Sequence, residues 1–433
     1  SSHFGQFRSK MAAGPLAGIK VLDFTQYQNG PTATRRLCDY GATVIKVEVP
    51  NIGDPMRKLV QLKDGYDLLF EIFNRGKRSV TIDLRKPEAR PVIERLVQWA
   101  DVVAENFRSG TMAGWGYGYE DIKNINPKII YGSSSGFGSL GRLSHLGCFD
   151  MTAQAYAGLM SAQGGGPSHE PMVVEHCAAD EVTGMTFAFA ILAALVSRAR
   201  TGEGQYLETS QLGALCEYQA NGAGLPTALK NGRTRNDGLP PFKFSPTQTY
   251  FIDSEGKWFV VCWIVQKFWE KMCQVCERLD LITDARTRGL SERAKNVQFM
   301  KEELQKTFAT NTRAHWIAAL QAVQIVCGPV NSYMDMIEEP HFWDNHYLAE
   351  VSHPHLPELG KIMVPGKAIT FHGTPAGPVT TGELLGESTD AILQEMGFGD
   401  EIESLKRAGV LQSSVGTTFR DRKAYPAPPK SKL

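Results

Sequence analysis

The stretch "IKVLDFTQYQNGPTATRRLCDYGATVIKVEVP", residues 19–50, decides the fold class. Residues 19–26 and 43–50 are apolar and rich in β-branched side chains, as buried strands are. The segment between them carries a proline near its start, which favours the first turn of a helix. Two strands joined through a helix run parallel in one sheet, so the stretch predicts an α/β fold.

The same alternation continues along the chain. Residues 79–84 form a third expected strand, residues 88–100 a helix, and residues 101–107 and 128–138 two further strands. Ligands of such sheets bind at the carboxyl ends of the strands. Gln28, Asn106 and the loop 133–136 are expected at that edge.

The 433 residues exceed what one core usually holds. Residues 222–246, rich in Gly, Pro and Asn, are typical of a linker. A hairpin and three helices are expected after it, as a smaller α+β unit. The pattern changes again near residue 330, with a strand-like segment and a final helix at 387–407.

The composition excludes several classes of protein. Lys and Arg total 46, as do Asp and Glu, so no basic excess indicates a nucleic-acid partner. The apolar run at 185–196 is too short to span a bilayer, and no membrane association is expected. The eight cysteines contain one CxxC, Cys273 and Cys276, with no histidine at ligand spacing. Reduced buried thiols and no metal site are the prediction.

The two chain ends bear on localisation. The first ten residues precede Met11, which has the look of a natural start, and they are treated as an extension. The chain ends in Ser431-Lys432-Leu433, which spells a peroxisomal address. The expectation is a cytoplasmic protein, or a peroxisomal matrix protein if the source is eukaryotic.

A carboxylate pair stands where the most apolar helix begins, in "AADEVTG" at 178–184. Asp is a favoured N-cap residue, so Asp180 has a structural interpretation. A carboxylate at a helix start is also close to backbone N–H groups that stabilise oxyanions, which favours chemistry. The two interpretations are compatible, and Glu181 is expected to be first-turn decoration.

Eight motifs stand in order over residues 15 to 410: "PLAGIKVLDFTQYQNGPTATRRLCDYGATVIKVE", "GDPMR", "FNRGKRSVTIDL", "DVVAENFRSGTM", "ADEVTG", "RTGEGQ", "CGPV" and "LLGESTDAILQEMG". With them the chain resembles the family III coenzyme A transferases, the CaiB/BaiF family. The resemblance implies a Rossmann-like large domain made from both chain ends, residues 11–224 and 331–433, and a small α+β middle domain, residues 225–330. It also implies two subunits interlocked as linked rings.

The resemblance further implies a reaction. Coenzyme A (CoA) moves from an acyl-CoA thioester to a free carboxylic acid, and the thioester is a substrate, with no permanently bound cofactor. Asp180 matches the catalytic aspartate, which forms a mixed anhydride and then an aspartyl-CoA thioester. We expect an ordinary pKa near 3.9 for it, so that it is ionised without a base. Gln28 matches a glutamine beside that aspartate, and its amide is expected to donate to an oxyanion.

Six residues fall where the family contacts the CoA nucleotide: Arg57, Asn74, Lys77, Arg78, Asn106 and Phe107. Two departures from formyl-CoA transferase stand out. Val49 replaces a basic residue, and "NGRTRNDGLPPFKF" at 231–244 lacks the glycine run of a mobile flap. Formyl-CoA with oxalate is therefore not carried over as the substrate pair.

Alternatives remain inside the superfamily. The α-methylacyl-CoA racemases place a histidine before an aspartate, but here Phe149 precedes Asp150, with His145 as the nearest substitute. Phe149 and Asp150 are expected at the acyl site, where Asp150 positions the acceptor acid or caps a helix. A homodimer is expected, and one subunit of a hetero-oligomer is the other possibility.

The aromatic and apolar residues near the strand ends favour a bulky or aromatic dicarboxylic acceptor acid, with succinyl-CoA as donor. They are Trp115, Tyr117, Tyr119, Phe137, Phe149 and Met151.

Overall fold

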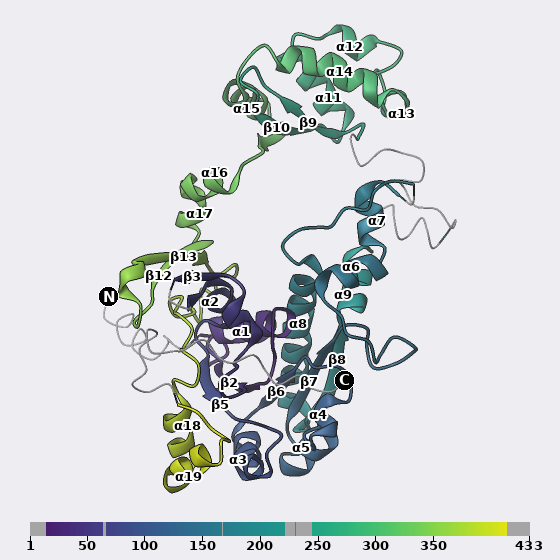
Figure 1. Ribbon diagram of the computed structural model, residues 1–433. Helices are drawn as coiled ribbons and strands as arrows, with labels where there is room; N and C mark the ends of the chain where they lie inside the picture. Colours follow the sequence, from purple (N-terminus) through teal and green to yellow (C-terminus); the bar gives the residue numbers. More distant parts are fainter. Residues whose placement is uncertain (1–13, 64–65, 167, 221–229, 231–244, 414–433) are drawn as a thin grey trace. The chain divides into compact units, whose positions relative to one another are not determined.

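A computed structural model describes residues 14–63, 66–166, 168–220, 230 and 245–413 (Figure 1). The extension 1–10, the stretch 231–244 and the tail 431–433 discussed above lie outside the described residues. The chain divides into a large unit, residues 1–163, 170–235 and 346–433, and a small unit, residues 164–169 and 236–345. The expected boundaries were 224/225 and 330/331.

The large unit is built on a six-stranded sheet with the order β5-β2-β1-β6-β7-β8. Every neighbouring pair is parallel. In chain order this is the doubly wound arrangement 3-2-1-4-5-6, whose ligand crevice lies between the first and fourth strands, here β1 and β6. The strands are β1 (Lys20–Asp23), β2 (Thr43–Glu48), β5 (Arg78–Thr81), β6 (Val102–Glu105), β7 (Ile130–Ser135) and β8 (Gln205–Ser210).

Helices cover both faces of this sheet. On one face α1 (Asn29–Asp39) and α8 (Ala178–Thr201) pack on alternate strand side chains, including Val21 and Ile130. On the other face α3 (Arg90–Trp99) and α5 (Tyr119–Ile125) share a core with the C-terminal helices α18 (Thr389–Glu395) and α19 (Ile402–Arg407). Figure 1 shows α18 and α19, in yellow, near α3. Both chain ends therefore contribute to one core.

The expected single helix at 387–407 is two helices. α18 ends before Gly397, whose φ of 90° an α-helix does not accept, and a short 3₁₀ turn at Gly399–Glu401 precedes α19. Glycine adopts this left-handed conformation without steric cost and commonly ends a helix.

The edge strand β8 was not foreseen. Its sequence, QYLETS, is polar, and its residues alternate between intermediate and exposed positions. An edge strand that is half in solvent needs no apolar run, so the sequence pattern of this segment does not indicate a strand. β8 leads directly into α9 (Gln211–Tyr218).

α1 and α8 approach closely at Gly184. A methyl group added there would collide with Thr32 and with the backbone carbonyl of Asn29. By length and composition alone α8 would pass for a membrane span, since it has 24 residues and an 18-residue stretch of it has a mean hydropathy of 1.7. Its Phe187 and Ile191 are fully buried against the sheet, which is the environment of a core helix.

The small unit contains an antiparallel sheet, β9 (Gln248–Ile252), β10 (Trp258–Cys262) and β11 (Val326–Pro329), in the order β11-β10-β9. Helices α11 (Gln266–Val275), α14 (Val297–Phe308) and α15 (Arg313–Ala322) pack on it. Cys273 and Cys276 are buried free thiols of this core. Short helices complete it: α12 (Asp280–Thr283), α13 (Leu290–Lys295), α16 (Tyr333–Glu338) and α17 (Pro340–Asp344).

The large unit has further small elements. They are β3 (Gln61–Lys63), β4 (Tyr66–Asp67), β12 (Leu348–Ser352), β13 (Lys361–Pro365), α2 (Leu68–Asn74), α4 (Thr111–Gly114), α6 (Asp150–Tyr156) and α7 (Leu159–Gly164, at the boundary of the units).

Candidate active site

The carboxylate pair lies in the first turn of α8. The residue that precedes the helix is Cys177, in the left-handed conformation (φ 54°), and its side chain does not cap the helix. The capping group comes from α6: Asp150 Oδ1 accepts the amide N–H groups of Ala179 (2.6 Å) and Asp180 (3.1 Å). Asp150 thus caps a helix, as one of the two expectations had it, and Asp180 is not the N-cap. The backbone N–H groups of Ala179 and Asp180 therefore already have Asp150 as their acceptor.

Gln154 holds the Asp150 carboxylate in place. Its Nε2 donates to Asp150 Oδ2 at 2.6 Å, and its side chain makes two further bonds with the backbone of Val174. Asp150 therefore has a fixed orientation toward α8.

Asp180 has amide donors and carboxylate neighbours. Gln211 Nε2 donates to Asp180 Oδ1 at 2.5 Å, and the Asn29 side chain is a second hydrogen-bonding neighbour. Burial and then the charge of Asp150 raise the pKa of Asp180 to about 7. The expectation of an ordinary pKa was wrong, because desolvation and a like charge both disfavour the ionised form. The groups that shift this pKa most include no histidine.

Gln28 contacts the other acid of the pair. Its Nε2 donates to Glu181 Oε1 at 3.1 Å, and Arg36 Nη2 approaches Glu181 Oε2 at 3.1 Å. Thr32 donates to Glu181 as well. Glu181 therefore joins α8 to α1. The Gln28 amide is bonded to Glu181, the residue that follows Asp180 in the chain.

Asn106 joins the loops after β1 and β6, at the crevice of the sheet. Its Nδ2 donates to the Gln26 carbonyl (2.7 Å) and to Asn29 Oδ1 (2.9 Å), and its Oδ1 accepts the Gln26 amide (2.7 Å). Asn29 in turn neighbours Asp180. In this structure Asn106 fixes the loop next to the aspartate, a role that the sequence did not indicate.

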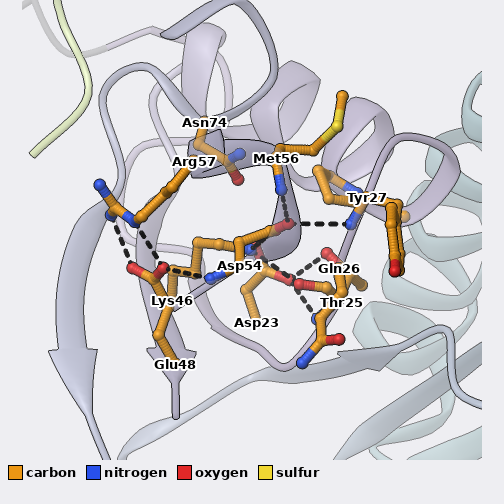
Figure 2. Close-up of polar contacts among 12 residues, drawn as sticks. Asp23, Thr25, Gln26, Tyr27, Lys46, Glu48, Asp54, Met56, Arg57 and Asn74 are labelled. Carbon is orange, nitrogen blue, oxygen red and sulfur yellow. Dashed lines mark hydrogen bonds and ion pairs between the residues drawn. The ribbon is translucent and has the colours of Figure 1, made fainter. Parts of the chain in front are cut away.

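Three of the residues expected to bind CoA, Arg57, Asn74 and Lys77, belong to a buried network, and Figure 2 shows Arg57 and Asn74 in it. Arg57 forms two 2.7 Å bonds with Glu48, and Lys77 Nζ lies 2.9 Å from Asp23 Oδ2 and 2.8 Å from Asn74 Oδ1. Burial lowers the pKa of Lys77 to about 8, although Asp23 opposes the shift. These side chains already have internal partners, and Lys77 is only 2% exposed, so a phosphate cannot reach it without rearrangement. Their expected contacts with CoA are not supported by this geometry.

A fourth expected contact is at the surface. Arg78 forms a bidentate pair with Glu395 of α18, both bonds being 2.8 Å. The pair joins β5 to the C-terminal segment.

Phe107 lies where a ligand can reach it. It packs edge-on against Trp115, with ring centroids 5.3 Å apart. Both line a pocket of about 160 Å³ together with Arg85 and Val49. The pocket lies at the carboxyl ends of β1, β2, β5 and β6, where a doubly wound sheet binds its ligand. Sequence reasoning missed Arg85, although it directly follows the expected strand 79–84.

The expected aromatic lining is only partly assembled. Phe149 is 65% exposed and meets Tyr27 edge-on at 5.5 Å, directly before Asp150. Tyr117 is a buried core residue and Tyr119 packs with Tyr131 against the same core, so the structure gives both a packing role instead of the expected place in an acyl pocket.

One group of potential metal ligands exists among the described residues. Single donor atoms of Asp150, Cys177 and Asp180 lie within 4.8 Å of one another. Both Asp150 oxygens and Asp180 Oδ1 already accept hydrogen bonds. Since their lone pairs are engaged, the group is better explained by carboxylate chemistry.

Fold and site together define a class of protein. It is an α/β enzyme with a nucleotide-type crevice and a partly buried aspartate, and "QYQNGPTATRR" after β1 lacks the GxGxxG of dinucleotide-dependent oxidoreductases. The model of CoA-transferase family III matches residues 16–389, so the chain belongs to that family and is a CoA-transferase.

Known proteins agree with this assignment. Succinyl-CoA:glutarate CoA-transferase of Mus musculus is 32% identical over 409 residues, which cover 92% of this chain and 90% of that protein. Formyl-CoA:oxalate CoA-transferase of Escherichia coli O157:H7 is 32% identical, over 91% of this chain and 98% of its own. The crystal structure of a CaiB/BaiF family protein from Brucella suis superposes with a TM-score of 0.76 at 29% identity, covering 89% of this chain and all of that one. The resemblance seen in the sequence is confirmed.

Proposed function

We propose that this CoA-transferase uses Asp180 as its nucleophile and passes through aspartyl anhydride and aspartyl-CoA thioester intermediates. The observation that carries the proposal is the Asp180 carboxyl itself: partly buried, bonded to Gln211 at 2.5 Å, and raised in pKa to about 7 by burial and by Asp150. A desolvated carboxylate with this pKa is a better nucleophile than an exposed one and is still substantially ionised at neutral pH.

The proposed reaction has four steps. A carboxylate oxygen of Asp180 attacks the thioester carbon of the donor, and CoA leaves as a thiolate. The thiolate then attacks Cγ of Asp180, which releases the donor acid and leaves an aspartyl-CoA thioester. The carboxylate of the acceptor attacks Cγ, expels CoA thiolate and forms a second anhydride. CoA thiolate finally attacks the acceptor carbonyl, which gives the new acyl-CoA and free Asp180.

The nucleotide end of CoA is assigned to the pocket after β1, β2, β5 and β6. Phe107 and Trp115 supply apolar ring surface there, and Arg85 supplies a positive charge at the rim. Arg85 is paired with Asp83, but its side chain is 63% exposed and so is available to a phosphate. In this proposal it replaces the basic residue that formyl-CoA transferase has at the place of Val49.

A dicarboxylic acid is the proposed acceptor. The two relatives named above are called transferases to glutarate and to oxalate. Exposed Phe149 next to Tyr27 offers an apolar contact beside the aspartate, which favours an acceptor longer than oxalate. Succinyl-CoA is the proposed donor.

The proposed assembly is a homodimer, interlocked as in the family. Apolar side chains are exposed along the outer face of α8, with Met185 53% and Phe189 72% exposed. They line a groove of about 870 Å³ together with residues of β8 and α9. An exposed apolar surface of this kind typically marks an interface. A heteromer with a related chain would use the same face, and light scattering of the purified chain distinguishes the two assemblies.

The test is a trapping experiment. The protein is incubated with succinyl-CoA or formyl-CoA, hydroxylamine is added, and the modified peptide is mapped by mass spectrometry. A hydroxamate at Asp180 is expected, and Asp180→Asn should give none. Absence of any adduct with either donor, together with uptake of deuterium at the α-carbon of a 2-methylacyl-CoA, would support a racemase instead. Phe149 at the place of the racemase base argues against that outcome, because a phenyl ring cannot accept a proton.

A further inference from the structure

Gln211 is a residue that no motif singled out. It is the first residue of α9, directly after the edge strand β8, and the Ser210 side chain caps the helix by accepting the Gly213 amide. Gln211 is only 2% exposed. Its Nε2 reaches across to α8 and donates to Asp180 Oδ1 at 2.5 Å. This bond is shorter than those that Gln28, Thr32 and Arg36 make with Glu181, which are 3.1 to 3.2 Å.

The other expected oxyanion donors are engaged elsewhere. The amides of Ala179 and Asp180 donate to Asp150, and the Gln28 amide donates to Glu181. Gln211 and Asn29 are the side chains that hydrogen-bond the reacting carboxyl, and Gln211 Nε2 is the donor to its Oδ1. Preorganised donors of this kind are worth most where negative charge develops.

The chemistry gives that oxygen a specific fate. With Oδ1 engaged by Gln211, Oδ2 is the oxygen that attacks the thioester, and Oδ1 becomes the carbonyl oxygen of the anhydride. When CoA thiolate then attacks Cγ, the electron pair of the carbonyl moves onto Oδ1, and it returns when the donor acid leaves. A donor already in place needs no reorganisation as the charge forms.

We propose that Gln211 is a catalytic residue of this transferase, whose side-chain N–H stabilises the oxyanion on Asp180 Oδ1 each time Cγ of the aspartyl intermediate is attacked. The proposal rests on Asp180 as the nucleophile. It assigns Gln211 to the two steps at Cγ and not to the attack on the donor thioester or on the acceptor carbonyl, where the charge develops on a substrate oxygen.

The test separates these steps in a single turnover. Quenched-flow mixing of the protein with succinyl-CoA gives free CoA as the anhydride forms, and bound CoA as the aspartyl thioester forms. In Gln211→Leu we expect formation of aspartyl-CoA to slow roughly 100-fold, as for loss of one oxyanion donor. At pH 9, where Asp180 is ionised with or without the Gln211 hydrogen bond that lowers its pKa, the burst of free CoA should keep its rate and grow in amplitude, because the anhydride accumulates.

Matched variants keep the test decisive. The control is Gln219→Leu, at the other end of α9. The Gln219 amide donates to the carbonyls of Ala157 and Leu215, so this variant removes a glutamine amide and leaves the bond between Gln211 and Asp180 in place. It should leave both steps unchanged. Gln211→Met keeps an unbranched side chain of similar length, removes the donor and adds no charge beside Asp180, so it provides the same test if the leucine variant does not fold.

Two outcomes would overturn the inference. Equal slowing of both steps would show a structural role, and an unchanged rate of aspartyl-CoA formation would show no role for the amide. Failure of the proposed function is a different result, since the unmodified protein would then show neither a CoA burst nor an adduct on Asp180.

Discussion

Two regions of the large unit hold carboxyl groups away from water, and the two differ in one respect. In the buried network, Glu48 faces Arg57 at 2.7 Å, as Figure 2 shows, and Asp23 faces Lys77 at 2.9 Å. At the start of α8, Asp180 faces amides and a second acid, Asp150. Although burial raises the pKa of Glu48, Arg57 and Lys46 hold it at about 2, while the pKa of Asp180 is raised to about 7.

The comparison shows what distinguishes a structural carboxylate from a reactive one in this molecule. Burial disfavours ionisation in both places, and only the presence of a cation reverses the effect. A paired carboxylate is a poor nucleophile, because attack would break its ion pair. An amide donor orients the carboxylate without neutralising it.

The largest expected effect comes from removing the reactive carboxylate. Asp180→Asn should lower kcat by at least about 10⁴-fold, as losses of a covalent nucleophile do. It should also raise Tm by a few degrees at pH 8. A raised folded-state pKa costs no stability below the unfolded value of 3.8, and the cost is complete above about 7. The gain in Tm should therefore shrink as the pH falls to 4, as calorimetry at several pH values can measure.

Removing a cation from the network should affect stability before catalysis. Lys77→Met removes the cation that pairs with buried Asp23 at 2.9 Å and should lower the free energy of unfolding by about 3–5 kcal/mol in a urea titration. Arg78→Met, which breaks a pair at the surface, is the matched control and should cost about 0–1 kcal/mol. A rise in KM for acyl-CoA with unchanged stability would return Lys77 to the CoA site.

The like charge beside Asp180 can be removed separately. Since Asp180 must be ionised to attack, kcat/KM should decrease as the pH falls below about 7, the pKa of Asp180. Asp150→Asn keeps a side-chain oxygen for the helix cap and should move this acid limb down by about one pH unit, that is, about tenfold in rate at pH 5. Glu181→Gln, a weaker influence on Asp180, should move it less. An acid limb that stays in place in both variants would show that another group controls it.

The smallest expected effect is at the nucleotide pocket. Arg85→Ala should raise KM for acyl-CoA about fivefold, equivalent to about 1 kcal/mol for one exposed charge contact. The same donor without its 3′-phosphate should show no difference between the two proteins. Equal KM values with the complete donor would place the phosphate elsewhere.

The fold was largely predictable, because apolar strands and amphipathic helices alternate in the first half of the chain. β8 escaped, since a half-exposed edge strand has no apolar run to reveal it. The site was predictable only where one residue carries the signal by itself, as Asp180 does in its motif. Arg57 and Lys77 have the residue types of phosphate ligands, but a sequence does not show that Glu48 and Asp23 already occupy them.

Gln211 shows the opposite limitation. It stands 31 positions from Asp180 in the chain, and it meets the aspartate only because β8 closes the sheet beside β7. A polar residue after a polar strand gives no local sign of this contact.

Gly184, the glycine of α8 that faces α1, has a consequence for interpreting natural variation. Gly184 touches neither CoA nor acid in the proposed reaction, yet a methyl group there would push Thr32 and the Asn29 backbone away from α8. Gln28 and Asn29 lie on the same stretch of backbone and would lose their contacts with Glu181 and Asp180. An inherited Gly184→Ala allele would thus be scored as a conservative change, while its carrier would have the biochemical phenotype of an active-site mutation.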